Sequence, residues 1–446
     1  MLLKRSLTKN SVPRIRWQKW VKPWQQVDWL LFCLPIAISI FGGLMILSTQ
    51  LSTQINTVFK QPIADWSLLA SNIIKTDWGG HWITAAIGGV IALLLALVRY
   101  ENFIQWHWVT YGLTNISLIA VMIAGHAEKG AQRWLGIAGF RFQPSEFAKI
   151  AIIITLAVLL HKSTASSLPK VFRALAITAV PWGLVFTQPD LATSMVFGAI
   201  VLGMLYWANA NPGWLILMIS PVIAAILDNV YKPGWIVWSM AMGLLAWQCL
   251  PWRRFGISAI SGMALNLLGG ELGAFAWNHV LKGYQKDRLT VFINPEHDPL
   301  GAGYHQIQSR IAIGAGEFKG SGLFHGPMTQ LNFVPEQHTD FIFSAVGEEF
   351  GLIGGLILLF VFGFVCLRLL HIAQTAKDNL GSLLAIGVLS MIVFQLVVNV
   401  GMTVGLAPVA GIPLPWMSYG RSAMLTNFIA LGIVESVANF RQRQRY

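Results

Sequence analysis

The stretch EEFGLIGGLILLFVFGFVCLRLL, residues 348–370, is a long apolar run that ends beside a basic side chain. About 20 consecutive apolar residues are enough for a helix to cross a lipid bilayer. The chain holds eleven further runs of this kind, at about 29–48, 81–98, 103–124, 145–161, 173–187, 191–208, 214–228, 234–251, 256–278, 381–400 and 421–438. The sequence therefore predicts an all-α polytopic membrane protein with about twelve transmembrane helices.

The overall composition agrees with this architecture. Of the 446 residues, 55% are hydrophobic and 11% are charged, which is more apolar surface than one soluble core can bury. The net charge of +12 is dispersed between the apolar runs, which favours anionic membrane lipids over nucleic acid as a partner. The three cysteines lie inside apolar runs and show neither a disulfide framework nor the spacing of metal ligands.

Basic side chains predict the orientation, because the cytoplasmic segments of membrane proteins are enriched in Lys and Arg. Residues 1–27 hold seven of them and are typical of a cytoplasmic basic tail rather than a cleaved signal. Arg368, near the end of the tenth run, and Lys377, just after it, then fall on the same inner side. Residues 28–440 form a single membrane domain with both termini in the cytoplasm, and the long loop at about 279–347 lies outside, between the ninth and tenth helices.

The large outer loop contains the polar stretch INPEHDPLGAGYHQIQSR, residues 293–310. Asp298 precedes a proline, and two interpretations stay open: a local Asp-Pro-x-Gly turn, or a general base desolvated by its surroundings. Further along the loop, His338 and Asp340 form either a hydrogen-bonded pair or half of a metal site. No third ligand at regular spacing supports the metal interpretation.

A second polar stretch, AQRWLGIAGFRFQPSEFAK, covers residues 131–149. Its Gln-Pro-Ser sequence predicts the entry of the fourth helix, with Ser145 as the cap. Glu146 and Lys149 then lie one turn apart, just inside the membrane, where charges pair with each other or face a polar cavity. The pair is either a couple at the helix mouth or an anion site, in which Lys149 and Arg133 hold a group such as a diphosphate.

Two more segments complete the candidate cavity. In QPDLATS, residues 188–194, Asp190 is expected to cap the sixth helix. In GLAPVAGIPLPWMSYGRS, residues 405–422, three prolines and three glycines exclude a straight helix, although the segment is apolar. Irregular backbone at membrane depth must be buried in protein or line a wet cavity, which predicts a re-entrant loop before the last helix. These patterns alone do not choose between a transporter, a channel and an enzyme.

Taken together, the motifs resemble those of the SEDS family of bacteria (shape, elongation, division and sporulation). The residues that carry the resemblance are RWL at 133, QPSEFAK at 143, QPDLAT at 188, YQKDRL at 284, NPEHDPLGAGYHQIQSRIAIGAG at 294, VPEQHTDFIFSAVGEEFGLIGG at 334 and PLPWMSYG at 413. They occur in the family's order and cover nearly the whole chain. The loop sequences are closer to the rod-shape, RodA-like branch than to the FtsW-like division branch.

The resemblance implies a peptidoglycan glycosyltransferase that polymerises lipid II on the outer face of the bacterial cytoplasmic (inner) membrane during cell elongation. Asp298 matches the family's essential acid and would be the general base of an inverting transfer. The implied substrate-binding residues are Arg133, Glu146, Lys149, Arg310, His338 and Asp340. A divalent cation, Mg or Mn, could share the diphosphate, although the sequence shows no closed metal cage. The implied partners are a class B penicillin-binding protein and the elongation machinery.

Two departures from the family pattern stand out. Family members have about ten spans, so the Trp-rich pair at about 211–252 is interpreted as an inserted helix pair on a ten-helix core. Arg421 follows the SYG motif, where the family has a small residue, and this places close backbone packing there in doubt. The alternative functions are a lipid II flippase or another multi-pass transporter, a scaffold that recruits a transpeptidase, and an FtsW-like division polymerase.

Overall fold

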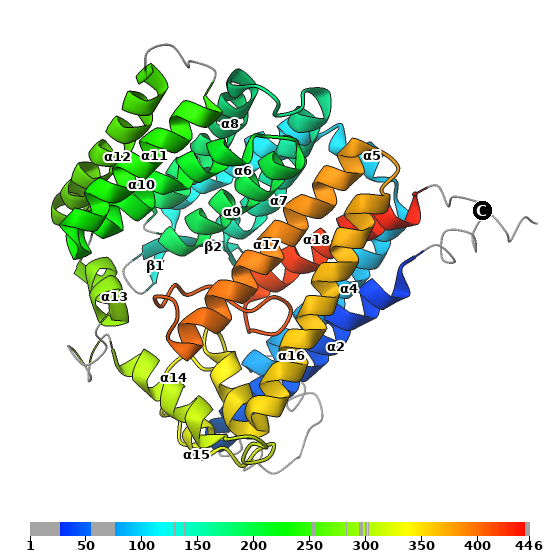
Figure 1. Ribbon diagram of the computed structural model, residues 1–446. Helices are drawn as coiled ribbons and strands as arrows, with labels where there is room; N and C mark the ends of the chain where they lie inside the picture. Colours follow the sequence, from blue (N-terminus) through cyan, green and yellow to red (C-terminus); the bar gives the residue numbers. More distant parts are fainter. Residues whose placement is uncertain are drawn as a thin grey trace, which may run out of the picture.

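The structure of the protein is a computed structural model (Figure 1) that describes residues 27–54, 76–128, 131–137, 140–188, 190–250, 256–281, 283–293, 298, 301 and 303–441. The predicted basic tail, residues 1–27, lies outside the described residues apart from its last position. Within the described part, twelve helices each overlap one predicted run: α2 (Trp29–Gln54), α4 (Asp77–Leu97), α6 (His107–Ala124), α7 (Pro144–Lys162), α8 (Leu168–Thr187), α9 (Leu191–Trp207), α10 (Pro212–Val230), α11 (Lys232–Cys249), α12 (Ile257–Phe275), α16 (Ile342–Thr375), α17 (Asn379–Val404) and α18 (Arg421–Asn439).

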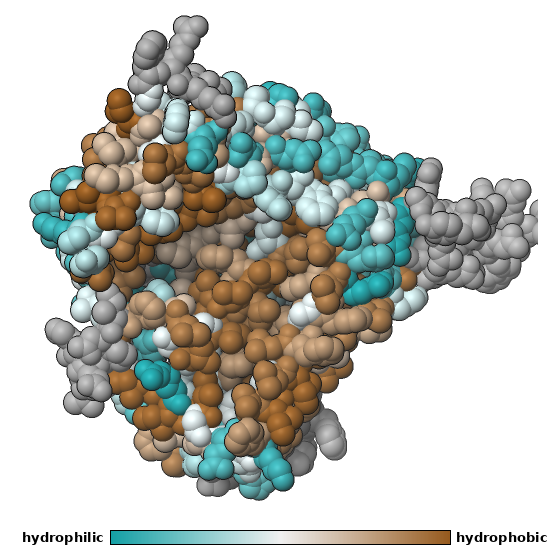
Figure 2. Space-filling view, viewed as in Figure 1, coloured by the Kyte–Doolittle hydropathy of each residue, from teal (hydrophilic) through white to brown (hydrophobic). Residues whose placement is uncertain are grey.

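These helices confirm the predicted polytopic architecture. Ten of the spans in the described residues are long and apolar enough to cross a membrane; α9, at 17 residues, is apolar but shorter, and the Trp-rich α11 is not among the ten. Figure 2 shows a broad hydrophobic surface over α16, α17 and the flank of α10–α12, with hydrophilic residues gathered toward the margins. A helix bundle with an apolar girdle is what a lipid bilayer requires.

Shorter elements connect the spans. They are α5 (Tyr100–Ile104), β1 (His126–Glu128), β2 (Ala131–Ile137), β3 (Phe140–Phe142), the π-helix η3 (Ala276–Val280), α13 (Gly283–Ile293), α14 (Tyr304–Ala315) and α15 (Pro327–Gln330). The three strands form a small antiparallel sheet in the order β1-β2-β3, which the sequence did not predict. We call the end of the bundle that carries this sheet, α13–α15 and residues 405–420 the loop end.

The centre of the bundle is built from α7, α17 and α18, around which α2, α4, α9 and α16 pack (Figure 1). Helices α7 and α18 are buried along nearly their whole length. Glycines allow the close contacts: a Cβ at Gly88 of α4 would lie 2.6 Å from Phe428 of α18, and one at Gly387 of α17 would lie 2.7 Å from Ile153 of α7. Small residues at helix contacts are the usual means of close packing in membranes.

Helices α10, α11 and α12 form a unit of their own at one side of the bundle (Figure 1). Leu217, Met242 and Ala246 make a small hydrophobic core that is separate from the main one. Gly262 of α12 packs directly against Ala246 of α11. The bounds of α10 and α11 match the predicted pair at 211–252, and the view that this pair is inserted into the family fold stays a prediction.

Helix α16 is broken near the loop end. Gly351 has φ 64° and ψ −163°, a conformation that L side chains rarely adopt, and divides the helix into a short first segment, residues 342–350, and a long second one. Residues 317–322 fill the break: Ser321 N donates to Glu348 O at 3.0 Å, and Leu352 N donates to Glu317 O at 2.9 Å. The backbone groups freed by the break therefore have partners in the large loop. The helix also begins at Ile342, six residues before the predicted run at 348.

Candidate active site

The QPSEFAK motif forms the entry of α7. Gln143 is extended (φ −108°, ψ 101°) and precedes the helix, and Pro144 is in the first turn, where no backbone N–H is needed. Ser145 is already inside the helix and buried, and its hydroxyl accepts a hydrogen bond from Gln143 Nε2 at 3.2 Å. The prediction that Ser145 caps the helix is therefore wrong, because the proline moves the cap position back to Gln143, whose side chain makes no cap bond.

Glu146 and Lys149 form a buried ion pair one turn inside α7. Lys149 Nζ lies 2.7 Å from Glu146 Oε2, and the two residues are only 1% and 3% exposed. The predicted pairing at i and i+3 is confirmed. Since both charges are out of water, each depends on the other, and removal of one partner from such a pair leaves a charge that the interior solvates poorly.

Arg133 joins this region from the small sheet. Its Nη1 lies 3.6 Å from Asp190 Oδ1, at the start of α9. Asp190 caps that helix as predicted, accepting from Thr193 N at 3.3 Å and from Thr193 Oγ1 at 2.9 Å. Gln143 Nε2 reaches the same carboxylate at 3.4 Å. The sheet and the beginnings of α7 and α9 thus share one set of polar contacts.

Helix α18 also contributes to these polar contacts, because the hydroxyl of Ser422 accepts a hydrogen bond from Gln143 N at 3.1 Å. We call the resulting group the α7 cluster; it consists of Arg133, Gln143, Ser145, Glu146, Lys149, Asp190 and Ser422. It contains both cations that the sequence assigned to a diphosphate. The Arg133 side chain is 27% exposed, whereas Lys149 is enclosed, so an anion that enters from the loop end meets the guanidinium before the ammonium.

His338 lies at a second polar site, beside the last residues before α18. Its Nε2 is 3.8 Å from Asp77 Oδ2 of α4, which also accepts from Gln50 Nε2 at 2.7 Å. Tyr419 N donates to His338 O at 3.0 Å, and the two rings are 6.0 Å apart. Burial, together with the nearby Asp77 carboxylate, raises the pKa of Tyr419, so its hydroxyl keeps its proton. The sequence proposed Asp340 as the partner of His338 and missed Asp77.

Arg421 begins α18 at the same site. Its guanidinium lies against Gly80 of α4, where an added Cβ would stand 3.1 Å from Arg421 Nη2. The large side chain that replaces the family's small residue is therefore accommodated by a glycine on the neighbouring helix. It adds a positive charge at the loop end.

Asp340 and Arg310 flank the irregular segment between α17 and α18. Gly405 (φ 84°) ends α17, and a Cβ there would lie 3.1 Å from Arg310 Cδ of α14. A Cβ at Gly411 would lie 3.4 Å from Asp340 Oδ2. Asn399 Nδ2 donates to both Asp340 O, at 2.9 Å, and Ile412 O, at 2.7 Å, and so fixes the segment to α17. Residues 412 and 414–418 of this Pro- and Gly-rich segment are buried in protein, whereas Leu406 and Gly411 are exposed.

Asp298 stands in the loop between α13 and α14 and is exposed. Its Oδ1 accepts a hydrogen bond from Gly301 N, and its carbonyl accepts one from Gly303 N, both at 3.0 Å. A Cβ at Gly301 would stand 2.2 Å from Asp298 Oδ2, so a larger residue there would displace the carboxylate from its present position. The local turn predicted from the sequence is therefore present. The preceding Glu296 and His297 lie outside the described residues.

All seven predicted site residues lie at the loop end, in three groups. Arg133, Glu146 and Lys149 share the α7 cluster; Arg310, His338 and Asp340 border the segment between α17 and α18; Asp298 opens α14. The described residues contain no group of three or more His, Cys, Asp or Glu side chains placed to hold a metal ion. The site can hold and stabilise an anionic group and offers one exposed carboxylate.

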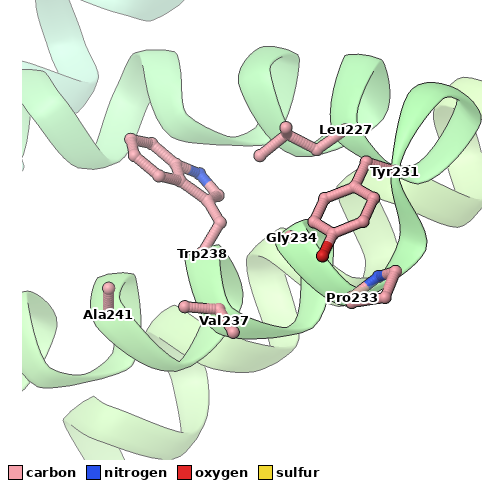
Figure 3. Close-up of a pocket in the computed structure, with 7 residues that line it drawn as sticks. All are labelled: Leu227, Tyr231, Pro233, Gly234, Val237, Trp238 and Ala241. Atoms are coloured by element: carbon pink, nitrogen blue, oxygen red, sulfur yellow. The ribbon is translucent and has the colours of Figure 1, made fainter.

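An apolar cavity of about 320 Å³ lies apart from these groups, where α10 turns into α11. Figure 3 shows Trp238 and Tyr231 on its two sides; its other lining residues are Leu227, Pro233, Gly234, Val237 and Ala241. The Tyr231 hydroxyl and the Trp238 indole N–H are the polar side-chain groups among them. The cavity lining therefore contains no carboxylate, imidazole, amine or guanidinium group.

Comparisons with known proteins agree with this arrangement. The family model of FtsW, RodA and SpoVE, described as a cell cycle protein, matches residues 28–235 and 213–443. The chain is 34% identical over 441 residues to the peptidoglycan glycosyltransferase RodA of Treponema pallidum, which covers 93% of this chain and 98% of that protein. It is 36% identical over 358 residues to the peptidoglycan glycosyltransferase MrdB of Escherichia coli K12, covering 80% of this chain and 84% of that protein.

Two solved structures share the fold. A chain from a peptidoglycan synthase complex superposes with a TM-score of 0.66 at 23% identity, and the rod shape determining protein RodA of Thermus thermophilus with 0.57 at 22%; each match covers 94% of this chain and 99% of that chain. The motifs, the helices and these matches agree along the whole described chain. The protein is therefore a member of the FtsW, RodA and SpoVE family, the SEDS proteins.

Proposed function

We propose that this protein is a peptidoglycan glycosyltransferase of the RodA type, which polymerises lipid II into glycan strands during cell elongation. The observation that carries the proposal is the α7 cluster, which places the buried ammonium of Lys149 on α7 and the partly exposed guanidinium of Arg133 on β2 at the loop end. A diphosphate-linked lipid needs cationic groups at membrane depth, and preorganised charges of this kind stabilise a departing diphosphate. Relatives named as this enzyme cover nearly the whole chain.

In the proposed reaction, Asp298 is the general base. Its carboxylate takes the proton from the 4-hydroxyl of one lipid-linked sugar, whose oxygen attacks the anomeric carbon of the other. The new O–C bond forms as the bond from that carbon to the diphosphate breaks, with inversion, and undecaprenyl diphosphate leaves. Asp298 is suited to this role because its turn is held by Gly301 and Gly303 while the carboxyl group stays exposed.

Lys149 and Arg133 stabilise the charge that develops on the leaving diphosphate, together with Arg310 of α14, which lies beside the end of α17. Glu146 holds Lys149 in the resting enzyme and sets the direction of its ammonium. His338 and Asp340 bind the sugar part of the substrate beside the segment between α17 and α18. Each of these contacts can strengthen as the negative charge grows, which is the requirement for catalysis.

A role for Mg²⁺ or Mn²⁺ stays a prediction, and the described side chains contain no group of three or more His, Cys, Asp or Glu placed to hold such an ion. No step of the reaction is therefore assigned to a metal held by the protein. A divalent cation would arrive with the substrate diphosphate.

The position of the enzyme in the cell follows from the same proposal. Both termini are cytoplasmic, and the loop end faces the periplasm or cell exterior, where lipid II presents its sugars. The cross-linking partner is a class B penicillin-binding protein. In support, one structure with the same fold comes from a peptidoglycan synthase complex that coordinates polymerisation and crosslinking.

Transport is the less favoured function. Transporters use broken helices whose free backbone groups bind the substrate. Here the groups at the break in α16 are bonded to residues 317–322. The broken helix therefore does not expose a binding site.

The proposal is tested with purified protein and labelled lipid II. The wild-type protein should form glycan polymer, and Asp298→Asn should not, because loss of a general base typically costs about 10²–10⁴-fold in rate. Asp287→Asn, in the exposed face of α13, is the matched control and should polymerise normally. Normal polymer formation by Asp298→Asn would remove Asp298 from the catalytic role.

A further inference from the structure

Gln395, in the middle of α17, is a buried polar residue whose side-chain amide has no hydrogen-bond partner among the described residues. It is 0% exposed, and neither its Nε2 nor its Oε1 has a hydrogen-bond partner among the described residues. An enclosed amide without partners is rare in proteins, and each such group calls for a specific explanation. By contrast, Asn399, one turn further along α17, makes two hydrogen bonds.

The contact between α7 and α17 places Gln395 at the depth of Glu146. The two helices run in opposite directions, and Gly387 lies on Ile153, where an added Cβ would be 2.7 Å from Ile153 Cγ2. From this contact toward the loop end, Glu146 is about 11 Å along α7 and Gln395 about 12 Å along α17, at 1.5 Å per residue. Glu146, Lys149 and Ile153 have the i, i+3, i+7 spacing of one helix face. The ion pair is therefore on the side of α7 that meets α17.

Gln395 also points toward the junction of α7 with α18. Gly387 of α17 contacts α7 and α9, whereas a Cβ at Gly381 would lie 2.8 Å from Val437 of α18. Successive residues of a helix are rotated by about 100° around its axis. By this rotation, Gln395 lies on the face of α17 between the direction of Gly387, toward α7, and the direction of Gly381, toward α18. Its amide is thus enclosed where α7, α17 and α18 meet.

A second unused group, the hydroxyl of Thr426 on α18, lies in the same place. Thr426 is 0% exposed, and its Oγ1 has no hydrogen-bond partner among the described residues. It is on the face of α18 that carries Val437 and meets α17. Counted from the Gly381–Val437 contact, it lies about one turn deeper than Gln395, at the level of Lys149. Two polar groups without hydrogen-bond partners among the described residues, the Gln395 amide and the Thr426 hydroxyl, therefore lie on neighbouring helices at the depth of the Glu146–Lys149 pair.

We propose that Gln395 is a positioning residue, helped by Thr426, that receives the Glu146 carboxylate when Lys149 turns to the substrate diphosphate. This inference rests on the proposed function. If Lys149 left without compensation, Glu146 would become an isolated buried charge, which is strongly unfavourable. An amide N–H from Gln395 and the hydroxyl of Thr426 satisfy that carboxylate in place of the ammonium. The two residues lack partners in the resting structure because their partner becomes available only in the substrate complex.

The proposal predicts that loss of the Gln395 amide lowers the rate of polymerisation without lowering the stability of the protein. Since Gln395 makes no hydrogen bond with the described residues at rest, Gln395→Met should leave the melting temperature unchanged or raise it. Lipid II polymerisation should fall by about tenfold, the size of one hydrogen bond to a charged group. Leu396→Met, the next residue on α17, is the matched control and should alter neither quantity. Thr426→Val should show the same pattern as Gln395→Met with a smaller loss of rate.

A double-variant comparison identifies the partner. In a Glu146→Gln background the carboxylate is gone, so Gln395→Met should reduce turnover by less than about twofold further. Should Glu146→Gln fail to fold, the pair Gln395→Met and Thr426→Val is measured instead, and the losses should be less than additive because both residues serve one carboxylate.

The outcomes are distinct. If Gln395→Met lowers both the melting temperature and the polymerisation rate, Gln395 makes a structural contact and the inference is wrong. If Gln395→Met polymerises lipid II at the wild-type rate, Gln395 has no role in turnover and the inference is also wrong. Neither result affects the proposed function. A wild-type protein that forms no polymer from lipid II overturns the proposed function, and the inference with it.

Discussion

Lys149 gives the most direct test of the α7 cluster, because the resting role and the catalytic role of its ammonium can be separated. Lys149→Ala removes one partner of an ion pair whose side chains are 2% and 4% exposed. Loss of one member of a buried pair typically costs about 3–5 kcal/mol, since the remaining charge keeps its desolvation penalty. This variant should melt at a clearly lower temperature in detergent and polymerise poorly. Its activity alone cannot distinguish binding from folding.

Lys149→Arg makes the distinction. It keeps the positive charge next to Glu146 but replaces a compact ammonium with a larger planar group of different reach. We expect a melting curve close to that of the wild type and a reduced rate of lipid II polymerisation. Lys162→Arg, at the exposed end of the same helix, is the matched control and should change neither. If Lys149→Arg melts and polymerises like the wild type, the position needs only a positive charge, and a specific ammonium contact with the diphosphate is wrong.

Three further predictions use other parts of the molecule. In a variant without native cysteines, Ser321→Cys should react with a membrane-impermeant maleimide in intact cells and Ser166→Cys should not; labelling of position 166 alone would reverse the proposed orientation. Gly351→Ala should lower the free energy of unfolding by about 1–3 kcal/mol, because the positive φ of this residue favours glycine and an added Cβ would stand 2.5 Å from Gly320 N. Gly363→Ala is the control: it has open space around it and should leave the melting curve unchanged. EDTA should leave the melting curve of the substrate-free protein unchanged, and a large shift that Mg²⁺ or Mn²⁺ reverses would reveal a resident metal.

The membrane architecture could be predicted from the sequence because it depends on the length of apolar runs, and each of the twelve runs contains one helix. The Glu146–Lys149 pair was also predictable, since it follows from spacing on a single helix. The small sheet was missed because two of its strands have only three residues, too few to show an alternating pattern. A strand of seven residues, β2, carries Arg133 into the α7 cluster.

The contacts of the candidate site were less predictable, because they join residues far apart in the chain. Asp77 meets His338 only when α4 and the residues before α16 pack together. The position of Gln395 depends on the register of α17 against α7, which is set by the fit of Gly387 on Ile153. The register of one helix against another depends on how side chains from several helices fit together. It could therefore not be predicted from the pattern of a single sequence.

The broken helix α16 has a mechanical consequence. Residues 342–350 are bonded to the large loop through Ser321 and Gly322, and the Glu348 carboxylate accepts from Met328 N at 2.7 Å and Thr329 N at 2.9 Å. The rest of the helix is anchored at the opposite end of the bundle by the ion pair of Arg368 with Asp28. The large loop is also bonded to the long segment, because Leu352 N donates to Glu317 O, so a protein that pulls on the loop acts on both sides of the joint at Gly351. Force on the large loop is therefore delivered to α16 at the loop end, which also carries the candidate site residues, while the Arg368–Asp28 pair restrains the opposite end.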